Sequence, residues 1–151
     1  MIAHWIVLAD ASVARILASD EDLTAFTEVM ELKHPRSRLH TSEIMADDRG
    51  RARASPGGGR TALEPHTDAA EVEHSKFAAI VAAKLLEGLD QRRYERLVVA
   101  APPRFLGLLR QELSPRVSAV VEAEIVRDYV HTPPQELSEL LRAQLADRTA
   151  A

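Results

Sequence analysis

Two short segments of the chain, His4–Ala9 and Arg96–Ala101, are apolar at every position after their first residue. A strand with this pattern carries apolar side chains on both faces, and both faces must therefore be covered by other elements. Helices packed on a sheet provide such a cover in α/β proteins. The two segments therefore predict an α/β fold in which helices lie on the faces of a sheet.

Further strands are expected on either side of these segments. Asp10–Ser12 has the composition of a tight turn, so Val13–Ala18 is expected to pair with the first segment as an antiparallel hairpin. A third strand is expected over Ala25–Lys33, where Val29 breaks the alternation of apolar and polar residues. The last strand is expected over Glu122–Val130.

Three segments have the periodicity or the terminal residues of helices. The first is expected to start at Thr67 or Asp68 and to end near Leu89, the second covers Arg104–Leu113, and the third starts in the Thr132–Gln135 capping pattern. The apolar stripes of the first and third helices are Phe77, Ile80, Val81, Leu85 and Leu89, and Leu137, Leu140, Leu141 and Leu145. Because glycine costs about 1 kcal/mol relative to alanine inside a helix, Gly107 indicates a close approach of another element.

The predicted element order is β-β-β, long loop, α, β, α, β, α. Three antiparallel strands followed by two right-handed αβ crossovers give a mixed five-stranded sheet with helices on its faces, which is the ribonuclease H-like arrangement. The sequence contains no internal repeat. Residues 1–151 are therefore expected to form one domain, with a long Gly/Arg-rich loop at about 34–68.

Composition excludes several classes of protein. The hydrophobic fraction of 46% and the charged fraction of 28% are those of an ordinary globular protein, and no apolar run is long enough to cross a bilayer. The amino terminus lacks the basic region and cleavage site of a signal peptide, so a cytoplasmic protein is expected. The chain has no cysteine, which excludes disulfides and thiol chemistry.

The segment Asp47–Arg60 holds most of the glycine of the chain and a dense set of arginines. Three consecutive glycines after Ser-Pro do not hold a helix or a strand. Arginine suits phosphate oxygens, and exposed glycine N–H groups add donors. The candidate phosphate or RNA contacts are Arg49, Arg51, Arg53, Gly57, Gly58, Gly59 and Arg60. The alternative is a surface connection whose arginines are neutralised by nearby acids such as Asp47 and Asp48.

Charge is distributed unevenly along the chain. The formal net charge is -4 and the isoelectric point is about 5.9, which argues against a protein that coats nucleic acid in general. Between Lys33 and Arg60, however, the sequence contains seven Lys or Arg residues and only three Asp or Glu residues. A local basic region on an acidic body is typical of docking to one polyanionic site.

The sequence lacks the residue patterns of most common enzyme active sites. Asp10 follows the first strand, where a two-metal nuclease places a carboxylate, but Ala100, Ala101 and Pro102 at the end of the fourth strand cannot ligate a metal. Asp10 is therefore expected to be a turn residue that accepts backbone hydrogen bonds. The six histidines lack ligand spacing, and no nucleophile elbow, Walker or dinucleotide motif is present. No catalytic residue, metal or cofactor is expected, and Arg104 and Arg110 are expected to be solvated charges.

Six blocks along the chain resemble the bacterial host attachment protein family. They are Trp5–Asp10, Ala14–Ile16, Asp48–Arg51, Ala101–Arg110, Arg127–Tyr129 and His131–Pro134, in the family's order. The residues of these blocks that the resemblance singles out are Asp10, Arg15, Arg104, Gly107, Arg110 and Asp128. The family is in turn similar to the middle domain of archaeal and eukaryotic class-one release factors and of Pelota, which has a ribonuclease H-like fold.

The release-factor resemblance implies a role for the long loop. In those factors the loop carries Gly-Gly-Gln, which enters the peptidyl-transferase centre and helps water attack the peptidyl-tRNA ester. The corresponding residues here are Gly58-Gly59-Arg60-Thr61-Ala62-Leu63, so Arg60 replaces the glutamine. This replacement keeps the glycines and adds charge, but it removes the amide.

Three functional hypotheses follow. The first is a cytoplasmic, non-catalytic module that binds the ribosome or tRNA through the Arg/Gly-rich loop, without contact to DNA or membrane. The second is a peptidyl-tRNA ester hydrolase in which Arg60 stabilises developing negative charge. The third is an interaction protein that affects attachment, with homo-oligomers formed through an exposed sheet edge.

Overall fold

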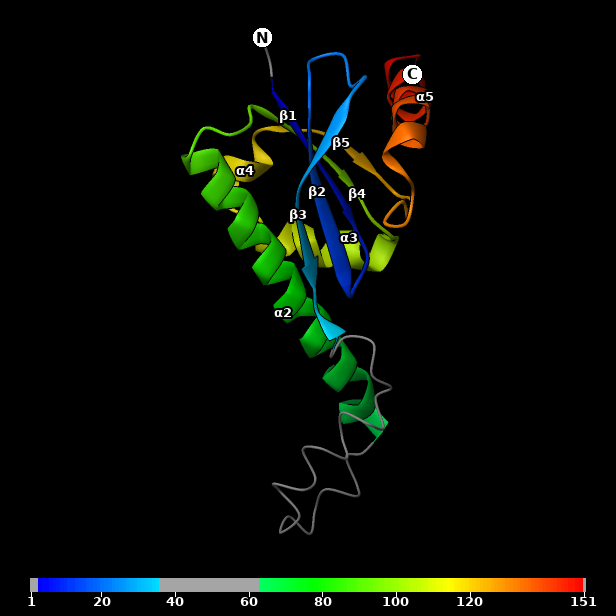
Figure 1. Ribbon diagram of the computed structural model, residues 1–151. Helices are drawn as coiled ribbons and strands as arrows, with labels where there is room; N and C mark the ends of the chain where they lie inside the picture. The colour runs from blue at the N-terminus through cyan, green and yellow to red at the C-terminus, as the bar shows by residue number, and fades with distance from the viewer. Residues whose placement is uncertain (1–2, 36–62, 151) are drawn as a thin grey trace.

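The computed structural model of the protein contains one mixed sheet with helices packed on both faces (Figure 1). It describes residues 3–35 and 63–150, and it places side chains for residues 3–35 and 69–146. The strands are β1 His4–Ala9, β2 Val13–Ser19, β3 Phe26–Lys33, β4 Arg96–Ala100 and β5 Val121–Ile125. The helices are α2 Leu63–Asp90, α3 Pro103–Glu112, α4 Pro115–Ser118 and α5 Pro134–Ala150.

The strand order is β3-β2-β1-β4-β5, which places β1 at the centre of the sheet. β1 is antiparallel to β2 and parallel to β4, β3 is antiparallel to β2, and β5 is parallel to β4. The α/β class and the ribonuclease H-like mixed sheet, with three antiparallel strands followed by two αβ crossovers, are therefore confirmed.

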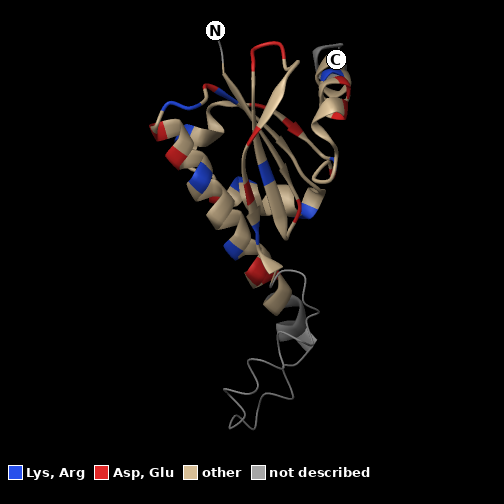
Figure 2. Ribbon diagram, in the orientation of Figure 1, with Lys and Arg blue, Asp and Glu red and all other residues tan. Residues whose placement is uncertain are grey.

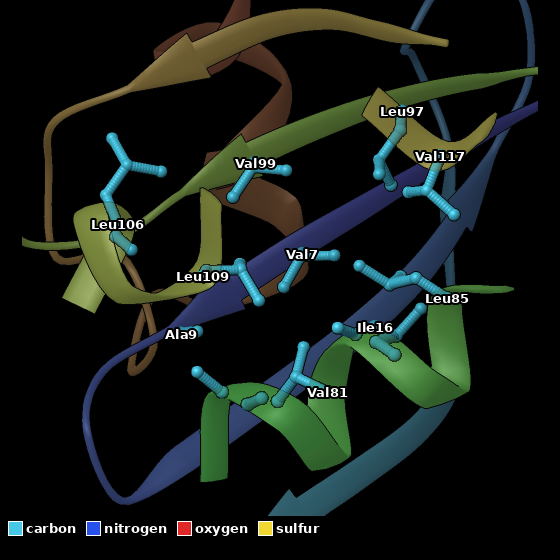
Figure 3. Close-up of a cluster of buried hydrophobic side chains, with 14 of the residues drawn as sticks. Val7, Ala9, Ile16, Val81, Leu85, Leu97, Val99, Leu106, Leu109 and Val117 are labelled. Carbon is cyan, nitrogen blue, oxygen red and sulfur yellow. The ribbon is translucent and has the colours of Figure 1, made fainter. Parts of the chain in front are cut away.

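One core fills the space between the sheet and helices α2, α3 and α4. Figure 3 shows Val81 and Leu85 of α2 directed at Ile16 and Val7 of the sheet, with Leu109 of α3 beside them. Residues four apart on α2 lie on one stripe, so Val81 and Leu85 reach the same layer of the sheet. Each fully buried side chain of this size contributes roughly 1.5–3 kcal/mol to folding.

A second core lies on the opposite face of the sheet, under α5. Ile6 and Leu8 of β1 point to this face, because successive residues of a strand alternate between its two sides. Leu137 and Leu141 of α5 cover them and are fully buried. Both alternations of β1 are thus buried, as its apolar sequence predicts.

The helix boundaries and stripes correct several expectations. α2 begins at Leu63 rather than at Thr67 or Asp68, because Pro65 lies in its first turn, where backbone N–H groups have no helical partner. Ile80 was expected in the buried stripe of α2 but is 42% exposed, and Leu140 of α5 is 36% exposed.

The last strand and the region before it also differ from the prediction. β5 ends at Ile125 instead of Val130, since the Asp128 side chain accepts a hydrogen bond from the Val130 N–H group at 3.3 Å and turns the chain. Ser114 does more than end α3. Its hydroxyl accepts a hydrogen bond from the Val117 N–H group at 3.2 Å and caps α4, a short helix that the periodicity did not indicate.

Val29 is the extra residue of a β-bulge in β3. The register pairs Ile16 with Met30 and Leu17 with Glu28, so Val29 has no opposite residue on β2. A bulge inserts one residue and reverses the alternation beyond it. This is why Phe26 packs on the core under α5, whereas Met30 packs on the core under α2.

A close contact fixes the carboxyl end of α2 to β1. The Trp5 ring stacks on Tyr94 with centroids 4.7 Å apart, and the Tyr94 hydroxyl donates a hydrogen bond to the Leu85 carbonyl at 2.6 Å. A Cβ atom at Gly88 would overlap the Trp5 ring. Glycine at this position is therefore required by packing. The close approach that was expected at Gly107 is wrong, since a Cβ atom there meets no atom within 4 Å.

We predict that alanine has opposite effects at these two helical glycines. Gly88→Ala should lower the free energy of unfolding by about 1–3 kcal/mol, because the Trp5 ring must move. Gly107→Ala should raise it by up to about 1 kcal/mol through helix propensity, since the space is open. Urea denaturation of both variants measures the difference. Equal effects of the two substitutions would contradict the contact at Gly88.

We also predict an alkaline loss of stability that depends on Tyr94. Burial, with a smaller contribution from the charge of Asp90, raises the pKa of Tyr94 to about 12, above the value of about 10 for an unfolded chain. The folded state therefore binds this proton more tightly, so its stabilising effect is complete below pH ~10 and is lost as the pH rises towards ~12.

Urea denaturation between pH ~9 and ~12 should show this loss, at no more than about 1.4 kcal/mol per pH unit. Tyr94→Phe should remove it, at a cost of about 1 kcal/mol at the lower pH for the lost hydrogen bond. Tyr129→Phe is the control and should keep the wild-type slope. An unchanged slope in Tyr94→Phe would contradict the assignment.

Candidate functional site

The turn between β1 and β2 is organised by Asp10. Its Oδ1 atom accepts hydrogen bonds from the N–H groups of Ser12 and Val13, both at 2.8 Å, and from the Ser12 hydroxyl at 3.2 Å. The Asp10 N–H group in turn donates to the Val13 carbonyl at 2.8 Å. The expected role of Asp10 as a turn residue that accepts backbone hydrogen bonds is confirmed.

A buried His–Glu pair lies beside this turn and joins the end of β3 to α2. Nε2 of His34 lies 2.9 Å from Oε2 of Glu73, whose side chain is 6% exposed, and Lys76 approaches the same carboxylate at 3.4 Å. The His34 ring stacks on Phe77 with centroids 5.6 Å apart, and the backbone N–H group of His34 donates to the Ser12 carbonyl at 2.8 Å. No sequence pattern predicts this pair, because its members lie far apart in the chain and follow no motif.

A half-open pocket of about 460 Å³ lies where the carboxyl ends of β1 and β4 meet α2 and α3. Asp10 and Ala11 line it from the turn, His74 from α2, and Arg104 and Leu108 from α3. The volume falls within the roughly 300–1,000 Å³ that ligand pockets occupy. It is more enclosed than a second, larger hollow of about 600 Å³ on α2.

The same edge of the sheet lacks the ligands for metal chemistry. β4 ends at Ala100 and is followed by Ala101 and Pro102, so Asp10 has no carboxylate partner from that strand end. Among the residues that the structure places, no group of three His, Asp or Glu side chains could hold a metal ion.

Arg104 and Arg110 project from α3 as charged surface residues. The Arg104 side chain is 87% exposed, and its Nη2 atom lies 3.4 Å from Oε1 of Glu71. Nε of Arg110 donates to Oε2 of Glu124 at 2.8 Å, and this hydrogen bond raises the pKa of the Arg110 guanidinium. Figure 2 shows that α2 carries Lys or Arg positions as well as Asp or Glu positions along its length. The helical surface around the pocket is therefore mixed in charge.

Arg15 and Asp128 hold the connection that leads from β5 to α5. Nη1 of Arg15 donates to the carbonyls of Val130 at 3.0 Å and Thr132 at 2.8 Å, and its side chain is 12% exposed. Its Nε atom lies 3.4 Å from Oε1 of Glu28 on β3. These contacts give Arg15 and Asp128 roles in positioning the chain before α5.

The candidate residues thus fall into separate groups. Asp10 and Arg104 line one pocket, Arg15 and Asp128 act on one connection, and Gly107 and Arg110 lie elsewhere on α3. The candidate phosphate contacts lie outside the described residues, and they are Arg49, Arg51, Arg53, Gly57, Gly58, Gly59 and Arg60.

Comparison with known proteins gives a family match over most of the chain. The model of the family described as "Protein required for attachment to host cells" matches residues 5–141. The uncharacterized protein RP470 of Rickettsia prowazekii (strain Madrid E) is 34% identical over 80 residues, which are 52% of this chain and 51% of that protein. The match thus spans about half the length of this curated relative.

The fold is also similar to that of a solved translation protein. The archaeal translation termination factor aRF1 matches with a TM-score of 0.50 and 11% sequence identity, over 97% of this chain and 42% of the factor. At this identity the match concerns the fold alone.

The helices placed by the structure include none with the length and hydropathy needed to cross a bilayer.

We predict that Arg15 is a strong determinant of stability. Arg15→Ala should lower the free energy of unfolding by about 2–3 kcal/mol, because two partly buried carbonyls lose a charged donor. Arg15→Lys should recover only part of this loss, since an ammonium group lacks the planar fork of a guanidinium. Urea denaturation measures both variants.

Glu28→Gln serves as the matched control for Arg15. It removes only the long ion pair to Arg15 and should change stability by less than about 0.5 kcal/mol. Amide hydrogen exchange at residues 129–132 should accelerate in Arg15→Ala and stay unchanged in Glu28→Gln. Unchanged exchange in Arg15→Ala would contradict the anchoring role.

Proposed function

The chain belongs to the family of proteins required for attachment to host cells, and we propose that it acts as a cytoplasmic, non-catalytic module that associates with RNA or the ribosome. The observation that carries the proposal is the combination of a termination-factor-like fold with a strongly basic segment between β3 and α2. The segment supplies Arg49, Arg51, Arg53 and Arg60 for contacts with phosphate. An effect on attachment would then be indirect.

The described body supports a docking function for that segment. Its helical surface combines charges of both signs, for example Glu71 with Arg104 and Lys84 with Glu87. Such pairs neutralise one another locally, so the excess positive charge between Lys33 and Arg60 is the part of the chain suited to a polyanion. Figure 1 places the end of β3 near the amino-terminal half of α2, and the His34–Glu73 contact fixes this arrangement. The end of β3, close to where the described residues stop, is therefore fixed to α2.

The absence of chemistry at the strand ends favours binding over catalysis. Within the described residues, the carboxyl ends of β1 and β4 bring together one carboxylate and no metal cluster. Gly58-Gly59-Arg60 resembles the Gly-Gly-Gln of release factors, which favours peptidyl-tRNA ester hydrolysis as the second candidate. The amide of that motif is replaced by the guanidinium of Arg60.

Gradient sedimentation of tagged protein in cell lysate tests the proposal. Wild type should travel with ribosomal particles, and a variant with Arg49, Arg51, Arg53 and Arg60 changed to alanine should remain at the top. A control with Arg92, Arg96, Arg116 and Arg142 changed to alanine loses the same charge from exposed positions and should sediment as wild type. If wild type also stays at the top, a protein partner replaces RNA as the expected target.

Salt dependence tests whether these arginines contact phosphates. If all four do, affinity for single-stranded RNA should fall roughly 10–100-fold between about 50 and 200 mM salt. The four-arginine variant should show a much flatter dependence. Release of peptide from a stalled ribosomal complex by wild type, lost in Arg60→Ala, would instead support the hydrolase.

A further inference from the structure

We propose that the pocket at the carboxyl ends of β1 and β4 binds a nucleoside monophosphate, either as a free nucleotide or as one unit of an RNA strand. In open α/β sheets, ligands bind outside the carboxyl ends of the strands. The pocket occupies this place, is about 460 Å³ in volume, and combines apolar walls with charged groups at its rim. These two halves match the two halves of a nucleotide.

The apolar half can receive the base. Ala11, Pro102 and Leu108 are partly exposed and line the pocket, with the buried Phe105 behind them. A heterocyclic base has an apolar face that gains free energy when it leaves water against such side chains. The proposal predicts weak selectivity among bases, since aliphatic walls contact the ring face and read no hydrogen-bond pattern.

The charged half can receive the phosphate. Arg104 carries five N–H donors on an 87% exposed side chain, and its contact with Glu71 is long at 3.4 Å. Exposed ion pairs of this kind contribute little, so a phosphate that offers a bidentate contact can replace Glu71, which also lines the pocket, as the partner of Arg104. His74 lines the same pocket from α2.

Asp10 gives the pocket a fixed polar group. Three donors from Ser12 and Val13 converge on its Oδ1 atom, so the carboxylate is held in one orientation by its own turn. A carboxylate held in this way accepts hydrogen bonds from the two hydroxyls of a ribose, which an apolar ligand cannot offer. Asp10 and Arg104 thus distinguish a nucleotide from an anion alone.

The described pocket is suited to binding and not to cleavage. Phosphodiester hydrolysis by two metal ions needs several carboxylates, and β4 ends in Ala100 without contributing one.

The proposal of nucleotide binding is independent of the proposal of ribosome association. A purified protein that never meets a ribosome would still bind a mononucleotide here, so the two proposals can fail separately.

Isothermal titration of the purified full chain with AMP, adenosine and inorganic phosphate tests the site. AMP should bind with a Kd of roughly 10 µM to 1 mM, which suits a small ligand with one apolar wall and a few polar contacts. Arg104→Ala should weaken AMP binding about tenfold or more and leave adenosine binding unchanged. Ala11→Leu should fill the pocket and weaken both ligands.

Arg116→Ala is the matched control, since it removes an exposed arginine on α4 that pairs with Asp90 and is absent from the pocket lining. AMP should bind to it as to wild type. Thermal unfolding of each variant separates loss of binding from loss of folding, and Arg104→Ala is the decisive variant because its side chain is exposed. No binding of AMP up to millimolar concentration, or equal losses in Arg104→Ala and Arg116→Ala, would overturn the proposal.

A short single-stranded RNA separates the two sources of the nucleotide. If the RNA binds more tightly than AMP, displaces it, and is weakened by Ala11→Leu, the pocket seats a nucleotide of an RNA strand. If the RNA leaves AMP bound, the ligand is a free nucleotide. Both results support the site, and AMP that binds Ala11→Leu as it binds wild type contradicts it.

Discussion

The burial of β1 on both faces is the constraint on which the rest of the structure depends. Trp5 and Val7 face one core, whereas Ile6 and Leu8 face the other, and all four are almost fully buried. A strand in this position needs neighbours on both edges and helices on both faces, since any exposed side would return apolar area to water. β2 and β4 pair with the two edges of β1, and α2, α3 and α5 cover the two faces of the sheet.

Contacts between polar groups that lie far apart in the chain fix the ends of several strands and helices. His4 lies at the start of β1, with Nε2 2.7 Å from Glu122 on β5 and Nδ1 3.1 Å from the Asp20 carbonyl. Arg15 fixes the chain before α5, and the His34–Glu73 pair fixes the end of β3 to α2. Because a buried polar group without a partner is costly, each contact favours one arrangement of its elements.

The sequence predicted the parts of the fold that depend on local patterns. Continuous apolar segments correctly predicted β1 and β4, and Pro103 correctly predicted the start of α3. Asp10 was correctly predicted to lie in a turn. Errors arose where side-chain contacts override a pattern. The Asp128 turn ended β5 early, and the Trp5 ring gives Gly88 the packing role that was assigned to Gly107. The pocket was missed because its lining comes from three separate segments, and only the fold brings them together.

The site lies where the central strand can first reach water. β1 is buried along its whole length, so polar side chains can follow it only beyond Ala9, and Asp10 and Ser12 are the first to do so. The neighbouring β4 is likewise buried up to Ala101, and Pro102 then starts the turn into α3. Parallel strands end at the same edge of the sheet, so the turn after β1 and the start of α3 must lie side by side. A concave, partly polar site at this edge is therefore a consequence of the same double burial that organises the core.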